Sequence, residues 1–221
     1  MGILIGLEGI DGSGKTTTLP LVIERLREKG LNCKLINKKK SDYDDLRIRK
    51  YAENIKNLIW YKEDDPYKFV TEQGWLYFHA LWYSILTENE INPNLEKFDL
   101  LIVDGWFYKM YCRFLLKENF NKNLLQSIYQ SIKKCDKVFL LNVKPEIVWE
   151  RGRNFNITEV GGYDTNVIDF KKSYINYQKH VQEKMLNIAE KENWNIIDSN
   201  QLNVQEVANQ ICEDIIKMVN K

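Results

Sequence analysis

The chain has 221 residues, of which 44% are hydrophobic and 29% charged, an ordinary globular composition that is long enough for one sizeable core. Its 32 Lys and Arg against 31 Asp and Glu give a formal net charge of +1, which argues against nucleic acid or a membrane as partner and favours a small molecule. The four cysteines lack the spacing of a zinc site or disulfide framework, and no apolar run is long enough for a signal peptide or membrane span, so we expect a cytoplasmic protein.

The N-terminal segment predicts a strand, a phosphate-binding loop and a helix. An apolar run at residues 3–7 indicates the strand, and residues 9–16 read Gly-Ile-Asp-Gly-Ser-Gly-Lys-Thr, a complete G-x-x-x-x-G-K-[ST] loop. Glycines let backbone N–H groups close around phosphate oxygens, because a Cβ would block that approach. Apolar residues then follow helical spacing up to Gly30. The segment therefore predicts a nucleoside triphosphate site at the positive end of a helix.

The loop supplies side chains as well as backbone groups. Lys15 is expected to lie along the β- and γ-phosphates, and Thr16 to offer its hydroxyl to Mg²⁺. The residues predicted to contact the nucleotide are Gly9, Asp11, Gly12, Ser13, Gly14, Lys15, Thr16 and Thr17. A Gly-rich turn that binds nothing is the alternative, which the flanking strand and helix disfavour.

Four further strands are expected, at residues 33–36, 100–103, 137–143 and 194–198. Those at residues 100–103 and 137–143 are largely continuous apolar runs, which is typical of buried parallel strands. Helical segments separate the strands, so we expect one domain with a parallel sheet covered on both faces. Ligands bind such sheets at the carboxyl ends of the strands, where the loop, Asp104 and Pro145 fall.

Residues 51–95 have a less definite pattern. An aromatic cluster at helical spacing predicts a buried helix face, and the alternative is a surface that stacks on a planar ligand. Tyr77, Phe78 and Trp82 are the candidates for that stacking. Lys38 begins a run of three lysines after the second strand, where the alternatives are a solvated turn and an anion contact.

Two segments resemble the thymidylate kinases. Residues 7–17 are similar to the family's E-G-x-D-G-x-G-K-T-T opening, and residues 140–153 are similar to its L-D-V-x-P-E-x-x-x-x-R-x-R strand, turn and lid helix. The resemblance implies an α/β P-loop kinase fold, a three-layer sandwich whose parallel five-stranded sheet has helices on both faces. It implies a single domain over residues 1–221 with a short lid at about 150–165. It also suggests a homodimer.

The resemblance implies catalytic roles for Lys15, Asp104, Arg151 and Arg153. The two arginines would belong to the lid and neutralise charge on the transferring phosphoryl group, and two solvated surface arginines are the alternative. Asp104 matches the aspartate of the family's D-R-[YFH] motif and could orient Mg²⁺ or the acceptor, and a helix cap is the alternative. Thr16 and Asp104 are therefore the candidate metal ligands.

Asp11 and the run of three lysines that begins at Lys38 are candidates to contact the acceptor, the molecule that receives the phosphoryl group. In the family the residue at the position of Asp11 approaches the acceptor sugar, and a carboxylate beside triphosphate is costly unless it meets Mg²⁺ or a hydroxyl. The predicted acceptor ligands are Asp11, Lys38, Tyr77, Phe78, Trp82 and Asp104.

The chain departs from the family in this acceptor half. The family has an arginine directly after the motif's aspartate, to hold the acceptor phosphate, whereas this chain has Gly105. A second family arginine, four residues after an aromatic on a helix, has no counterpart in residues 75–82. The candidates to replace these two charges are Lys38, Lys39, Lys109 and Arg113.

The resemblance predicts an ATP- and Mg²⁺-dependent phosphotransferase that acts on a nucleoside monophosphate, with deoxythymidylate as the leading acceptor. The missing arginines leave two alternatives open, since each lost charge-assisted contact weakens phosphate binding. One is a kinase for an uncharged acceptor such as a nucleoside or modified metabolite. The other is a nucleotide-binding regulatory protein without transfer activity. A GTPase-like switch is disfavoured because the chain has no N-K-x-D signature.

Overall fold

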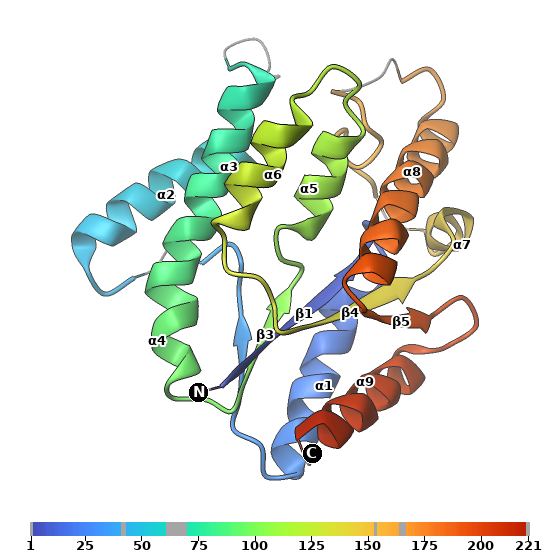
Figure 1. The fold of residues 1–221 in the computed structure, drawn as a ribbon. Helices are drawn as coiled ribbons and strands as arrows, with labels where there is room; N and C mark the ends of the chain where they lie inside the picture. Colours follow the sequence, from blue (N-terminus) through green and yellow to red (C-terminus); the bar gives the residue numbers. More distant parts are fainter. Residues whose placement is uncertain (1, 41–42, 61–69, 153, 164–166, 220–221) are drawn as a thin grey trace.

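The computed structural model of the protein describes residues 2–40, 43–60, 70–152, 154–163 and 167–219 (Figure 1). Five parallel strands form one sheet in the order β2-β3-β1-β4-β5. They are β1 (Ile3–Gly9), β2 (Cys33–Ile36), β3 (Leu100–Asp104), β4 (Lys137–Asn142) and β5 (Asn195–Asp198). Each strand that the apolar runs predict is present, with bounds shifted by no more than two residues, and the parallel sheet is confirmed.

β1 lies at the centre of the sheet, with β3 paired to one edge and β4 to the other. The chain adds strands first on one side of β1 and then on the other, so the strand order reverses at β1. The carboxyl ends of β1 and β3 meet at this switch point, which is where open α/β sheets bind ligands. The phosphate loop follows β1 at that edge.

Helices cover both faces of the sheet, as predicted (Figure 1). On one face lie α1 (Lys15–Glu28) and α9 (Val204–Val219). On the other lie α3 (Glu72–Leu86), α5 (Tyr108–Leu115), α6 (Lys122–Gln130) and α8 (Phe170–Lys191), and α2 (Leu46–Trp60) packs against α3. The other described helices are α4 (Asn92–Leu95), α7 (Pro145–Glu150) and a π-helical segment, Thr87–Ile91.

Side chains of the central strands alternate between two hydrophobic cores. Leu4 and Leu101 pack under α3, α5 and α8, whereas Ile5 and Leu100 pack under α1 and α9. This two-residue period follows from the pleat of a strand. Because both faces are covered, the strands read in sequence as continuous apolar runs instead of alternating ones.

The described part of residues 51–95, whose pattern was indefinite, is almost entirely helical. Thr71 caps α3 by accepting a hydrogen bond from the Gly74 N–H at 3.1 Å. Trp75, Trp82 and Tyr83 are buried, so the predicted buried helix face is confirmed for these three residues.

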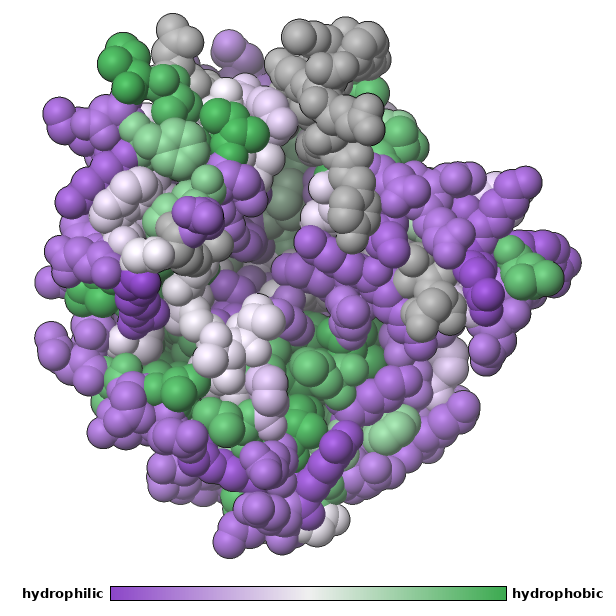
Figure 2. Space-filling view, turned by 180° about the vertical axis from the view of Figure 1, so that it is seen from behind, coloured by the Kyte–Doolittle hydropathy of each residue, from purple (hydrophilic) through white to green (hydrophobic). Residues whose placement is uncertain are grey.

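The surface seen from behind is largely hydrophilic. Figure 2 shows hydrophilic residues over most of this face, with hydrophobic ones gathered at its upper left and in its lower half, and a hollow in the upper middle of the view. Among the residues described above, none of the helices combines the length and the apolar character that crossing a membrane requires.

Candidate active site

The phosphate loop between β1 and α1 leaves an open space in front of Gly14. Gly14 caps α1 with φ 98°, and a Cβ built on it would meet no described atom within 4 Å. A Cβ on Gly9 would lie 2.6 Å from the Ser13 Oγ, so the loop's own packing requires glycine there. Gly12 is partly exposed, and Thr17, in the first turn of α1, is exposed. The loop therefore fits a phosphate group at the helix N-terminus.

Lys15 begins α1, and its side chain folds back over the loop. Its ammonium donates to the carbonyl oxygens of Gly9 and Ile10, both at 2.9 Å, and to the Ser13 Oγ at 3.1 Å. Burial, together with the nearby Lys109 ammonium, lowers the pKa of Lys15 to about 7. A triphosphate bound at the loop would bring negative charge close to this ammonium and stabilise the charged form of Lys15.

Thr16 and Asp104 meet where β1 and β3 end. The Thr16 hydroxyl donates to the Asp104 Oδ2 at 2.6 Å. Asp104 does not cap a helix, since α5 begins only at Tyr108. A hydroxyl and a carboxylate are hard oxygen ligands, which Mg²⁺ takes beside phosphate groups. In the described part of the chain, no cluster of three or more His, Cys, Asp or Glu side chains offers another metal site.

Asp11, inside the loop, is surrounded by cations and hydrogen-bond donors. Lys109 and Arg113 lie one turn apart on α5 and reach its two carboxylate oxygens at 2.5 and 2.6 Å. Gln178 donates to the carboxylate at 3.1 Å, and the Tyr174 hydroxyl donates to the Asp11 carbonyl at 2.7 Å. Burial would raise the pKa of Asp11, but the two cations outweigh it and hold this pKa well below its usual range. Sequence reasoning missed Gln178 and Tyr174, because no local pattern marks them.

Two further charged side chains lie beside the loop. Glu8, in β1, is fully buried, and its Oε1 accepts from the Trp106 N–H at 2.6 Å. Burial raises the pKa of Glu8. Lys38 follows β2, and its ammonium reaches the backbone at Gly105, directly after β3. Lys38 therefore lies at the same edge of the sheet as the loop.

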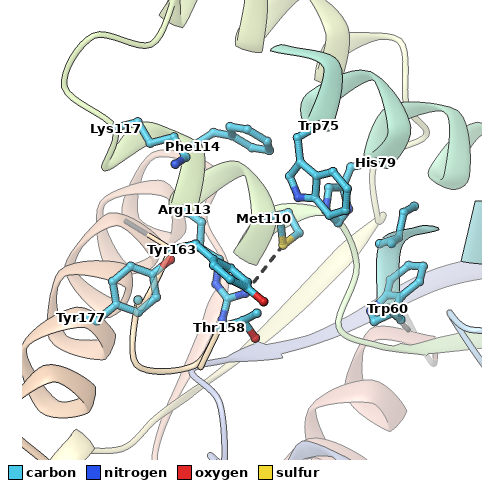
Figure 3. A pocket seen from close by; sticks show the side chains of 12 residues that line it. Trp60, Trp75, His79, Met110, Arg113, Phe114, Lys117, Thr158, Tyr163 and Tyr177 are labelled. Atoms are coloured by element: carbon cyan, nitrogen blue, oxygen red, sulfur yellow. Dashed lines mark hydrogen bonds between the residues drawn. The ribbon is translucent and has the colours of Figure 1, made fainter. Parts of the chain in front are cut away.

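A cavity of about 110 Å³ opens beside Arg113 (Figure 3). Trp75 and His79 project into its wall from α3, and Met110 and Arg113 from α5 (Figure 3). Arg113 also pairs with Asp11, so the cavity and the phosphate loop share one boundary. The remaining lining residues are Ile59, Trp60, Phe114, Lys117, Thr158, Gly161, Tyr163 and Tyr177.

The sequence matches a known family over most of its length. A profile of the family described as Thymidylate kinase matches residues 7–211. The chain belongs to the thymidylate kinase family. The predicted resemblance is therefore confirmed, and with it the assignment of the chain to the phosphotransferases.

Curated relatives and a solved structure agree with this assignment. Probable thymidylate kinase 2 of Saccharolobus solfataricus is 26% identical over 208 residues, which cover 90% of this chain and 89% of the relative. The thymidylate kinase of Buchnera aphidicola is 29% identical over 190 residues, which cover 85% of this chain and 82% of the relative. The solved thymidylate kinase of Candida albicans matches with a TM-score of 0.68 at 20% identity, over 99% of this chain and 93% of that chain, and supports the fold.

In this thymidylate kinase family member, the predicted stacking residues do not line the cavity. Trp82 is fully buried, and its indole N–H donates at 2.8 Å to a carbonyl of the segment after β2. Tyr77 is 51% exposed, and Phe78 packs at a steep angle against Trp75. Trp75 of the same helix lines the cavity. Helical spacing identified the aromatic stripe, but the rotation of α3 against the sheet decides which ring faces the site.

The predicted lid is described in part. α7 ends at Glu150, so Arg151 lies beyond a regular helix, where it is exposed. Arg153 lies outside the described residues, and its role stays a prediction. Thr158 and Gly161, in the same segment, line the cavity, which the sequence alone did not indicate.

Proposed function

We propose that the protein transfers the γ-phosphoryl group of ATP to a nucleoside monophosphate, with deoxythymidylate as the leading acceptor. The observation that carries this proposal is the shared boundary at Arg113, which pairs with Asp11 of the loop and lines the aromatic cavity. A phosphate loop and an acceptor cavity that adjoin can hold two reactants in position for direct transfer. The thymidylate kinases among the relatives support deoxythymidylate as the first acceptor to test.

The proposed binding of ATP, the phosphoryl donor, rests on Lys15, Thr16 and Asp104. Mg²⁺, when bound, would neutralise charge on the phosphate oxygens, and Thr16 and Asp104 fit it as ligands. Lys15 would take the β- and γ-phosphates, and Arg151 and Arg153 are proposed to neutralise the transferring group. Phosphoryl transfer passes through a loose transition state, so positioning and charge neutralisation are the main tasks of these residues.

Charge in the site favours a phosphorylated acceptor over a neutral nucleoside. The basic side chains around the loop outnumber the acidic ones, the basic being Lys15, Lys38, Lys109 and Arg113 and the acidic Glu8, Asp11 and Asp104. Charges with little access to water need counter-charges nearby. The triphosphate would meet the charge of Lys15, and an acceptor phosphate would supply a counter-charge for Lys38, Lys109 and Arg113, whereas a nucleoside would not.

Acceptor-dependent ADP formation by the purified protein with Mg·ATP tests this proposal. Deoxythymidylate, the other monophosphates and the free nucleosides are compared side by side, with Lys15→Ala as the background control. We expect stimulation by deoxythymidylate above all others. Stimulation by nucleosides alone would favour the uncharged-acceptor alternative, and ATP binding without turnover on any acceptor would favour a regulatory protein.

Replacing Trp75 by leucine is expected to raise the KM for the acceptor roughly tenfold, because a ring against a base contributes about 1–3 kcal/mol. The kcat and the KM for ATP should change little, since no residue of the phosphate loop lines the cavity that Trp75 lines. Steady-state kinetics with varied acceptor at saturating Mg·ATP measure both constants.

Tyr77→Leu is the matched comparison, because Tyr77 lies on the same helix but outside the cavity. A larger rise in acceptor KM for Tyr77→Leu than for Trp75→Leu would contradict the cavity assignment. That outcome would support the stacking predicted from sequence.

We also infer a homodimer that packs through α2 and α3. Tyr51 and Leu58 of α2 are 68% and 53% exposed, and Leu81 of α3 is 48% exposed. Large apolar side chains gathered on neighbouring helices are typical of an interaction surface. Sedimentation of the purified chain and of Leu58→Glu tests this inference, with a monomer expected only for the variant.

We further propose a reducing, cytoplasmic compartment. Cys33, Cys112, Cys135 and Cys212 are free thiols. Burial raises the pKa of Cys33 and of Cys212 to about 11, which keeps both in the unreactive thiol form. Free thiols of this kind are typical of intracellular proteins.

A further inference from the structure

A second cavity, of about 680 Å³, lies between α5, α6 and α8, and Figure 1 shows α5 between the other two helices. α5 separates it from the acceptor cavity, because Met110 and Arg113 line that cavity whereas Tyr108 and Tyr111 line this one. Among the described residues, none lines both. Its volume is in the range of small-molecule sites, roughly 300–1,000 Å³. We call this cavity the α6–α8 groove, and its lining includes Phe107, Tyr111, Tyr129, Lys134, Lys184 and Lys191.

Aromatic rings in mutual contact form a wall of the α6–α8 groove. The rings of Phe107 and Tyr129 stack with their centroids 5.0 Å apart. Tyr111 meets Tyr129 edge-on at 5.4 Å, and Phe107 packs against Tyr108 at 4.2 Å. All four residues line the groove. Such a wall offers ring faces and edges to a ligand, so it suits a molecule with a flat aromatic ring.

The Tyr129 hydroxyl has no hydrogen-bond partner among the residues that the structure describes, although Tyr129 is only 2% exposed. Other buried tyrosines nearby are paired. The Tyr83 hydroxyl donates to the Trp106 carbonyl at 3.3 Å, and the Tyr108 hydroxyl accepts from the Cys135 N–H at 3.2 Å. Burial raises the pKa of Tyr129 well above its usual range, so its phenol keeps its proton and is a donor. A buried donor without an acceptor costs free energy, which an oxygen of a bound ligand would recover.

Three lysines give the groove an excess of positive charge. Lys134 pairs with Glu192 at 2.6 Å, which joins the segment after α6 to the end of α8. Lys184 and Lys191 lie about two turns apart on α8, and neither makes an ion pair within the described part of the chain. Lys191 is in the last turn of α8, where a cation complements the helix dipole. Lys184 lies inside the helix and is partly buried, so the helix end gives no reason for its charge.

We propose that the α6–α8 groove is a second ligand site, separate from the phosphate loop and the acceptor cavity, which binds a planar aromatic anion, the chemical class to which nucleotides belong. The ring would lie against the aromatic wall and the anionic group beside Lys184 and Lys191, with an oxygen accepting from Tyr129. A neutral aromatic molecule would leave the two lysines without a counter-charge, and an inorganic anion would leave the wall uncovered. The site uses no residue of the proposed phosphoryl transfer, so it goes beyond the proposed function.

Fluorescence titration with a matched pair of dyes tests this proposal. Anilinonaphthalenesulfonate is a planar aromatic anion, and phenylnaphthylamine is the same ring system without the sulfonate. Saturating Mg·ADP and deoxythymidylate are present, to fill the nucleotide and acceptor sites without transfer. We expect the sulfonate dye to bind one site per chain, about tenfold or more tightly than the neutral dye, and to bind more weakly as salt is added. Equal binding of both dyes, or displacement of the sulfonate dye by the nucleotides, would overturn the proposal.

Lys184→Met should weaken binding of the sulfonate dye about 10-fold or more, as expected for one lost charge-assisted contact, and leave the neutral dye unaffected. Lys179→Met is the charge-matched control, because Lys179 is exposed on the same helix and does not line the groove. It should bind the dye as the wild type does. An equal loss in both variants would indicate a general attraction of anions to α8 and no site.

Tyr129→Phe removes the unpaired hydroxyl and keeps the ring. It should weaken binding of the sulfonate dye several-fold, while the unfolding temperature of the free protein stays equal or rises, since the hydroxyl has no partner to lose. A purely structural hydroxyl would give the opposite pattern, a lower unfolding temperature with unchanged dye binding, and that result would contradict the assignment.

Lys15→Ala and Trp75→Leu locate the dye without relying on the proposed function. Both should bind the sulfonate dye as the wild type does, because Lys15 belongs to the phosphate loop and Trp75 to the acceptor cavity. Loss of dye binding in either variant would place the dye in that site and refute the second one. Dye binding is measured without turnover, so a protein inactive on every monophosphate would refute only the proposed function.

Sedimentation distinguishes a ligand site from a contact between copies of the chain. Lys184→Met and Tyr129→Phe should have the same mass in solution as the wild type, with or without dye. A lower mass for either variant in the absence of dye would show that a second copy of the chain covers the groove, and the ligand site would then be wrong.

Discussion

Lys15→Ala is expected to lower kcat/KM for phosphoryl transfer by on the order of 10³-fold or more. The Lys15 ammonium is almost fully buried and held by three oxygens of the loop, so it lies next to the space that the glycines leave open. In such a site, with little water, a charge aimed at phosphate oxygens contributes much more than at the surface. Steady-state kinetics with varied Mg·ATP measure the loss, and calorimetry measures the weaker binding of ATP.

Lys29→Ala is the control for this variant, because Lys29 lies exposed at the other end of α1. It removes the same charge from the same helix and should leave turnover unchanged. Circular dichroism of Lys15→Ala should match the wild type, which separates lost chemistry from lost fold. Unchanged turnover in Lys15→Ala would refute the donor site.

Asp11→Asn is expected to lower the free energy of unfolding by about 3 kcal/mol at pH 7, because it leaves two largely buried cations without their counter-charge. The side chains of Lys109 and Arg113 are each 15% exposed, and that of Asp11 12%. Urea unfolding of both proteins measures the difference. Asp45→Asn is the control, since Asp45 pairs at the surface with Arg47, and it should change stability far less.

The difference in the free energy of unfolding between wild type and Asp11→Asn should depend on pH. The folded pKa of Asp11 lies below its ordinary value of 3.8, since the cations favour the charged carboxylate. The stability that Asp11 contributes is therefore complete above about pH 5 and is lost as the pH falls through 4 toward the folded pKa. The difference between wild type and Asp11→Asn should stay constant from pH 8 to 5 and shrink below pH 4. A constant difference down to pH 3 would contradict the ion pairs.

The sequence by itself was sufficient for the fold and for the place of the phosphate loop, on which the proposed donor side rests. The G-x-x-x-x-G-K-[ST] pattern lies within eight consecutive residues, so its geometry depends on the local backbone alone. The strands could be predicted because a sheet covered on both faces requires continuous apolar runs. Asp104 could be assigned to the site because parallel strands end at one edge, and its hydrogen bond with Thr16 follows from that position.

The proposed acceptor side was decided by the tertiary structure. Asp11 and its two cations are about 100 residues apart in sequence, and no local pattern records which of several lysines and arginines will reach it. The rotation of α3 turns Trp75 toward the cavity and uses Trp82 to hold the backbone at Lys38, although both residues belong to one aromatic stripe. Such contacts join side chains from separate elements, and their distances depend on how the helices pack against the sheet. Local spacing carries no information about that packing, which is why the phosphate loop could be predicted from the sequence and the lining of the proposed acceptor cavity could not.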